Sequence, residues 1–200
     1  MSSKIIKIIA DGSIIAIANA EKYNASLQNQ VDWTWRQLTH FLFGQNRDNL
    51  IVFSTAFEDE WTFEFIINGE TNQPYFRKFE QSIEVTNGIL HFVNWTDLTS
   101  SLQFENTMIP EEFNSDLNIE LVNGFYRIVV KQLFDNEDYD YDPENKTNYI
   151  VELFLESKNP NINAKTILWT EDFPNDDSIF LSTERNEFDD LLDNMMNENN

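Results

Sequence analysis

The residues of this chain that are richest in functional groups form one short stretch, residues 135–144. It holds six carboxylates, no base and two tyrosines, namely Asp135, Glu137, Asp138, Tyr139, Asp140, Tyr141, Asp142 and Glu144. Rows of carboxylates can occupy the phosphate sites of a basic cleft, and tyrosines add stiff contact area at the centre of an interface. The stretch therefore predicts a surface that binds a basic protein, such as a nuclease. The alternative is a solvated hairpin tip that only prevents aggregation at a sheet edge.

The same carboxylates suggest a second chemistry, the binding of calcium. Asp138, Asp140 and Asp142 alternate along the chain, and carboxylate oxygens are ligands that Ca²⁺ prefers. An EF-hand loop that starts at Asp138 would need glycine where Pro143 stands and glutamate where Tyr149 stands. Because the sequence departs from the motif at both positions, we expect no cofactor, with a weak surface calcium site as the alternative.

Residues that could support catalysis are few. The two histidines, His40 and His91, lie in segments predicted to be a helix and a strand, and we interpret both as packed or surface residues. The sequence contains no Gly-rich phosphate loop, no helical His-Glu-x-x-His motif and no nucleophile elbow. Some pair among the 35 acids would always suit glycoside hydrolysis, so such a pair indicates little. We therefore expect a protein that is not an enzyme.

The charge of the chain is strongly negative and unevenly placed. The formal net charge is -22; residues 1–50 hold four acids and five bases, whereas residues 171–200 hold ten acids and one base. Such a field repels nucleic acid and anionic lipid and attracts basic partners. The alternative is that the acidity serves solubility alone. Cysteine is absent, which excludes disulfides and fits a reducing compartment such as the cytoplasm.

Two alternating segments flank the acidic stretch and must position it. Tyr126, Ile128 and Val130 point to one side of the first segment, and Tyr149, Val151, Leu153 and Leu155 point to one side of the second. Period-two patterns of this kind are typical of strands with a buried face. We therefore predict a hairpin over residues 124–157 that carries the acidic stretch as its loop.

The rest of the chain also favours strands. We predict a hairpin over residues 1–20 around the Asp11-Gly12 turn, rather than a signal peptide, because this turn interrupts the apolar run. A helix is predicted at 30–43 from the spacing of its apolar residues. Further strands are expected at 49–56, 61–68, 75–84, 89–95, 102–104, 117–122 and 164–169.

The fold class is mainly β, an antiparallel β-sandwich or strongly bent sheet with one early helix and an acidic C-terminal helix. We expect a β-rich domain over 1–170 and an acidic helical tail over 171–200, docked on the same domain.

Three short motifs resemble the ComJ family of inhibitors of a DNA-entry nuclease. They are Asp32-Trp33 at the start of the predicted helix, the Val85–Ile89 turn that contains Asn87-Gly88, and the Gly124-Phe125-Tyr126 strand entry. The resemblance covers roughly residues 31–134 and implies a compact, mainly β inhibitor of a nuclease. The leading hypothesis is an inhibitor or immunity protein of bacterial type that neutralises a basic toxin. The alternatives are a general β-sandwich assembly module, and a carbohydrate-binding protein or enzyme.

Overall fold

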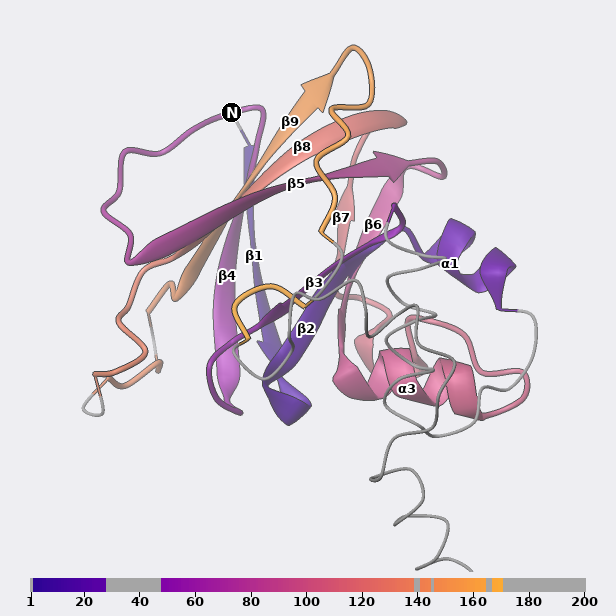
Figure 1. Ribbon diagram of the computed structural model, residues 1–200, viewed down its shortest axis with the longest axis horizontal. Coiled ribbons are helices and arrows are strands. Elements are labelled where there is room, and N and C mark those ends of the chain that lie inside the picture. Colours follow the sequence, from indigo (N-terminus) through magenta and orange to yellow (C-terminus); the bar gives the residue numbers. More distant parts are fainter. Residues whose placement is uncertain (1, 28–47, 139–140, 145, 165–166, 171–200) are drawn as a thin grey trace, which may run out of the picture.

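The computed structural model describes residues 2–27, 48–138, 141–144, 146–164 and 167–170, and in these residues nine strands form two sheets (Figure 1). The five-stranded sheet has the order β1 (Ser2–Ile9), β4 (Glu60–Ile67), β9 (Tyr149–Glu156), β8 (Gly124–Gln132) and β5 (Arg77–Val85). The four-stranded sheet has the order β3 (Leu50–Ser54), β2 (Ile14–Ala18), β6 (Ile89–Asn94) and β7 (Asn118–Glu120). Neighbouring strands are antiparallel except β4 and β9, which are parallel. The expectation of a mainly β fold is confirmed.

The hairpin predicted over residues 124–157 is present as β8 and β9. These strands pair in register from Phe125 opposite Glu156 to Gln132 opposite Tyr149. The predicted inward residues of β8, such as Ile128, are buried between the sheets, as are Val151 and Leu153 of β9. Burial of a large apolar side chain contributes about 1.5–3 kcal/mol. The alternating pattern therefore fixes which face of this hairpin is inside.

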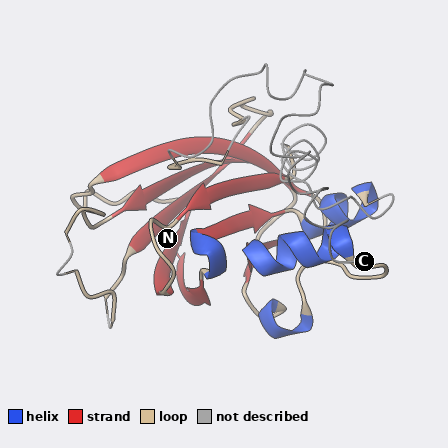
Figure 2. Cartoon of the chain, turned by 60° about the horizontal axis from the view of Figure 1, so that its bottom comes forward, coloured by secondary structure: helices blue, strands red, loops and turns tan. Residues whose placement is uncertain are grey.

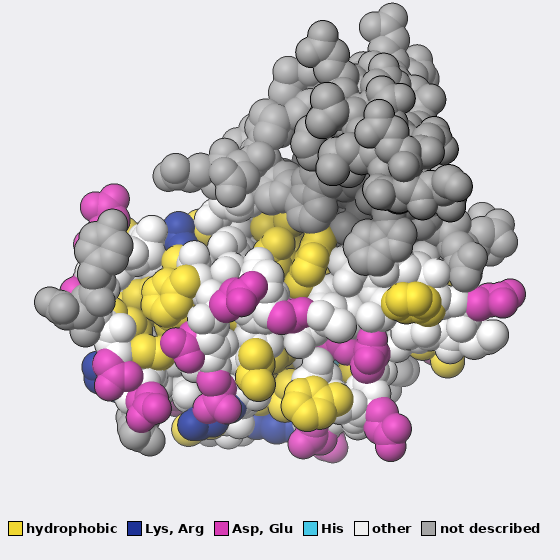
Figure 3. Space-filling view, turned by 90° about the horizontal axis from the view of Figure 1, so that it is seen from below, with side chains coloured by type: hydrophobic (Ala, Val, Ile, Leu, Met, Phe, Trp, Pro, Cys, Tyr) yellow, Lys and Arg dark blue, Asp and Glu magenta, His cyan; other side chains and the backbone are white. Residues whose placement is uncertain are grey.

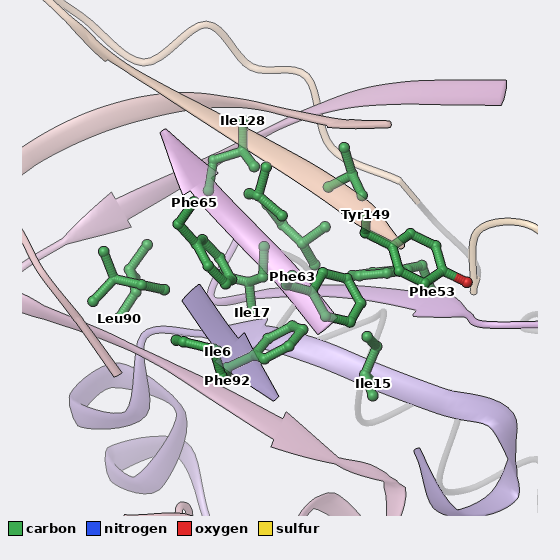
Figure 4. Packing of buried hydrophobic residues seen from close by; sticks show 14 of the residues in the cluster. Ile6, Ile15, Ile17, Phe53, Phe63, Phe65, Leu90, Phe92, Ile128 and Tyr149 are labelled. Carbon is green, nitrogen blue, oxygen red and sulfur yellow. The ribbon is translucent and has the colours of Figure 1, made fainter. Parts of the chain in front are cut away.

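Aromatic rings fill the space between the two sheets (Figure 4). Phe63 of β4 stacks on Tyr149 of β9, with ring centroids 4.5 Å apart, and meets the ring of Phe92 edge-on at 4.6 Å. Phe92 belongs to β6 of the opposite sheet, so these contacts join the two layers. Each such pair adds about 0.5–1.5 kcal/mol beyond the area that it buries.

Two short helices, α1 (Ala20–Ser26) and α3 (Trp95–Gln103), lie together on one side of the strands (Figure 2). Leu98 and Leu102, one turn apart on α3, pack with Ala16 and Val93 of the four-stranded sheet in a second apolar cluster. The helices therefore cover the outer face of this sheet. Among the described helices, none is long and apolar enough to cross a membrane.

The hairpin predicted over residues 1–20 is wrong, because β1 and β2 belong to different sheets. All five residues of β2 are buried: Ile15 and Ile17 face the core between the sheets, and Ile14 and Ala16 face the helical layer. A strand that is apolar on both faces takes a central position, and β2 is paired on both sides, with β3 and with β6. The Asp11-Gly12 turn exists, with φ of 58° at Gly12, but it leads the chain from one sheet to the other.

The strand predicted at 102–104 is also wrong, because residues 95–103 form α3. This helix begins with a capping box: Asp97 N donates to Asn94 Oδ1 at 3.0 Å, and Asn94 N donates to Asp97 Oδ2 at 3.2 Å. The strand expected at 164–169 is reduced to one bridge between Leu168 and Phe53 in the described residues. The helix predicted at 30–43 and the C-terminal helix lie outside the described residues.

Candidate protein-binding site

The acidic stretch lies in the connection between β8 and β9, residues 133–148, which we name the acidic loop. Figure 1 shows it extending beyond the ends of these strands, on the side of the molecule away from α1 and α3. Its sixteen residues contain six acids, and Lys146 is the one base among them. The acidic loop therefore carries the net negative charge of the hairpin.

Asn148, which is fully buried, holds the base of the acidic loop to β4. Its side-chain oxygen accepts from Thr62 N at 2.7 Å, and its backbone N donates to Thr62 O at 2.9 Å. Its side-chain NH₂ donates to the Tyr141 hydroxyl at 2.8 Å and to Pro143 O at 3.2 Å. A buried polar side chain whose donors and acceptors are all used fixes its neighbours in one arrangement. The loop thus leaves the sandwich from a rigid base.

Stacked aromatic rings support the same base. Phe134 lies between Trp61, at 4.9 Å and an interplanar angle of 8°, and Tyr141, at 4.3 Å and 14°. Tyr141 is half-buried, and its burial raises the pKa of its phenol above the usual value of 10.0. The Lys146 ammonium lies 5.0 Å from the centre of the Tyr141 ring. Tyr141, predicted from the sequence to be a contact residue, therefore also anchors the loop to the core.

Five of the predicted site residues are exposed on this anchored connection: Asp135, Glu137, Asp138, Asp142 and Glu144. Two of them also order the local backbone, because Asp135 Oδ1 accepts from Glu137 N at 2.9 Å and Asp142 Oδ1 accepts from Glu144 N at 3.0 Å. Tyr139 and Asp140 lie outside the described residues. The arrangement presents carboxylates to solvent from ordered turns, which suits the binding of cationic groups.

In the described part of the chain, little supports the alternative chemistries, which are metal binding and catalysis by histidine. No group of three or more His, Asp or Glu residues is placed there so that it could hold a metal ion, and Asp140 of the calcium hypothesis lies outside it. His91 lies in β6, and burial lowers the pKa of its imidazole below the usual 6.5. His40 lies outside the described residues.

A buried ion pair on the outer face of the five-stranded sheet was not predicted. Lys131 Nζ of β8 lies 2.7 Å from Glu152 Oε1 of β9, and the two side chains are 5% and 2% exposed. Thr71 covers them: its N donates to Glu152 Oε1 at 2.7 Å, and its O accepts from Lys131 Nζ at 3.0 Å. The alternation of β9 correctly places Glu152 on the face opposite Val151. It carries no signal that the connection between β4 and β5 would fold over this face.

Comparison with known proteins gives two solved structures. One is the crocagin biosynthetic gene J product, with a TM-score of 0.49 and 15% identity, covering 78% of this chain and 99% of that chain. The other is ComJ from Bacillus subtilis, an inhibitor of the DNA degrading activity of NucA, with a TM-score of 0.48 and 16% identity, covering 78% of this chain and 98% of that chain. The resemblance to ComJ expected from the sequence is therefore confirmed, as a distant one. No protein-family model and no curated protein sequence matches the chain.

Proposed function

We propose that this protein is a non-enzymatic inhibitor that binds a basic toxin, most specifically a nuclease, and neutralises it by covering its active site or an adjacent exosite. The observation that carries the proposal is the row of five exposed carboxylates on the acidic loop, whose base is fixed by Asn148 and Phe134. Inhibition would be stoichiometric, would need no cofactor and would take place in the cytoplasm.

Physical arguments support a binding role for this loop. Exposed charges of one sign increase the rate of encounter with a partner of the opposite sign. Turns that are already ordered, such as those at Asp135 and Asp142, lose less conformational entropy on binding, so more of their contact energy appears as affinity. The nuclease as partner class is implied by the motifs shared with the ComJ family, Asp32-Trp33 among them.

The proposal is tested by capture followed by inhibition. The full chain, immobilised, is exposed to an extract of the cells that produce it, and bound proteins are identified by mass spectrometry. We expect a basic nuclease, whose DNA-degrading activity falls in proportion to added chain and disappears near one equivalent. Full activity at a tenfold excess, or recovery of no basic nuclease, would overturn the proposal.

The contribution of the acidic loop is measured with two variants of equal charge. Glu137→Gln/Glu144→Gln removes two exposed carboxylates from the loop. The control Glu64→Gln/Glu70→Gln removes the half-buried carboxylate of Glu64 in β4 and the exposed carboxylate of Glu70 in the connection that follows it. Surface plasmon resonance at two salt concentrations should show slower association and a weaker salt dependence for the loop variant, because exposed charges are screened over about 10 Å at 0.1 M salt. Equal association rates for the two variants would contradict a steering role of the loop.

A further inference from the structure

The connection between α3 and β7, residues 104–117, exposes three large apolar side chains; we name it the α3–β7 loop. Phe104 is 59% exposed, Met108 61% and Phe113 79%. Single exposed apolar residues are ordinary on protein surfaces, but large apolar residues grouped beside polar ones mark sites of protein contact. Three of them within ten residues of one connection therefore need an explanation.

The α3–β7 loop is held in place by polar side chains at two points, the half-buried Asn24 of α1 and the buried Asp97 of α3. Asn24 of α1 binds both backbone groups of Ile109: its Nδ2 donates to Ile109 O at 2.7 Å, and its Oδ1 accepts from Ile109 N at 3.0 Å. Asp97, which is 1% exposed, accepts from Glu111 N at 3.0 Å and from Asn114 Nδ2 at 2.7 Å. Because Ile109 itself is buried in the apolar cluster below α3, its exposed neighbours point outward from an ordered backbone.

The charged side chains of the α3–β7 loop itself are all acidic. Glu105, Glu112 and Asp116 are exposed in the same connection, and no Lys or Arg occurs between residues 95 and 126. Lys4 is a described base near this region: its Nζ donates to Asn118 O at 2.6 Å, just beyond the connection. Figure 3 shows hydrophobic and acidic side chains interspersed, with fewer basic ones, on the face seen from below, the end of the molecule at which α3 lies in Figure 1.

We propose that the α3–β7 loop is the anchoring surface for the basic partner, with Phe104 and Phe113 seated in apolar pockets that are rimmed by lysine or arginine. The inference rests on the proposed function, because it concerns the same partner. Aromatic side chains in fully desolvated pockets dominate the energy of most interfaces, whereas rim charges contribute mainly to rate and specificity. The α3–β7 loop offers a basic surface both exposed aromatic side chains and negative charge. Its negative charge would repel an acidic surface.

The test uses the full chain in three versions. Phe104→Ser/Phe113→Ser removes the proposed anchors, and the control Ile5→Ser/Ile9→Ser removes two apolar residues of β1 that are 63% and 53% exposed. Each version is used to capture proteins from the native cell extract, and dissociation of the purified, identified partner is measured by surface plasmon resonance. Unfolding midpoints of all versions show whether they remain folded, which is expected because the replaced side chains are exposed.

We expect the anchor variant to bind the basic nuclease at least about tenfold more weakly than wild type, through faster dissociation, and the control to bind within about twofold of wild type. If the nuclease binds the anchor variant as tightly as it binds wild type, the inference is refuted while the proposed function stands. If a basic protein that is not a nuclease binds and depends on Phe104 and Phe113, the inference stands and the proposed function fails. If wild type recovers no basic protein, both are refuted.

Discussion

Replacement of Lys131 by methionine should destabilise the folded protein far more than replacement of a lysine in an exposed ion pair would. Methionine retains most of the apolar stem of lysine and removes its ammonium. Glu152 would then keep the hydrogen bond from Thr71 N but lose its cation 2.7 Å away, in a site where both side chains are at most 5% exposed. The perturbation therefore leaves a carboxylate buried without a counter-charge.

The magnitude follows from the burial of this pair. Removing one partner of a buried ion pair costs about 3–5 kcal/mol, whereas replacing both with apolar residues is often neutral or stabilising. For a chain of 200 residues, 1 kcal/mol corresponds to about 2–4 °C in melting temperature, so Lys131→Met should lower the Tm by roughly 6–20 °C. The double variant Lys131→Met/Glu152→Leu should recover most of this loss. Its Thr71 N–H should exchange faster with solvent, because the pair that holds Thr71 is gone.

Urea denaturation followed by circular dichroism gives the free energy of unfolding for each variant. The matched control is Lys7→Met, since Lys7 and Glu60 form an ion pair at 3.0 Å with both side chains 53% exposed, and an exposed pair contributes about 0–1 kcal/mol. The reasoning fails if Lys131→Met costs no more than the control. It also fails if the double variant loses as much free energy of unfolding as Lys131→Met and Glu152→Leu lose together when each is made alone, because the two charges would then not be coupled.

Three further predictions concern the acidic loop, the strand histidine and the tail. Tyr141→Phe removes the hydroxyl that accepts from Asn148 and should cost about 0.5–1.5 kcal/mol in urea denaturation; Tyr141→Ala should cost more, because it also removes the stacked ring, and equal losses would show that the ring does not anchor the loop. Burial lowers the pKa of His91, so the unfolded chain binds the proton more tightly and stability should fall as the pH drops below about 6.5. His91→Gln should reduce that slope between about pH 7.5 and pH 5, and an unchanged slope would contradict a contribution from His91. We propose that residues 1–170 fold without the tail, so truncation at Asn175 should leave a cooperative thermal transition; its loss would place the tail in the core.

Local alternation predicted the strands well, because a strand with one buried face shows its period in the sequence itself. The hairpin of β8 and β9 is the clearest case. The pairing partner of a strand cannot be predicted in this way, because a turn signal such as Asp11-Gly12 indicates only that the chain changes direction. Which sheet β2 joins depends on residues 50–54 and 89–94, its neighbours in space. The prediction of an N-terminal hairpin failed for that reason.

The helix α3 could have been found from the sequence. Asn94 followed by Asp97 is the pattern of a capping box, and Leu98 and Leu102 are spaced by four, as the buried face of a helix requires. By contrast, nothing local to Glu152 indicates that Thr71 covers it, because the two are 81 residues apart in sequence. The candidate site shows the same division. Its carboxylates are visible in the sequence, but the inward orientation of Tyr141 depends on Phe134 and Trp61 in the fold.

In the complex that we propose, the two acidic connections would have different parts in binding. The acidic loop carries five described exposed carboxylates, while its one described tyrosine, Tyr141, packs partly inward. The α3–β7 loop has fewer acids, but it exposes Phe104 and Phe113 on an ordered backbone. Charges set how often partners meet, and desolvated aromatic contacts set how long they stay together. Charge removal in the acidic loop should therefore change mainly the association rate, and truncation of Phe104 and Phe113 should change mainly the dissociation rate.

The two sets of variants, measured on one partner, should have additive effects on log Kd if the loops act at separate places on its surface. A coupling of more than about 0.5 kcal/mol would instead mean that both loops contact one continuous site.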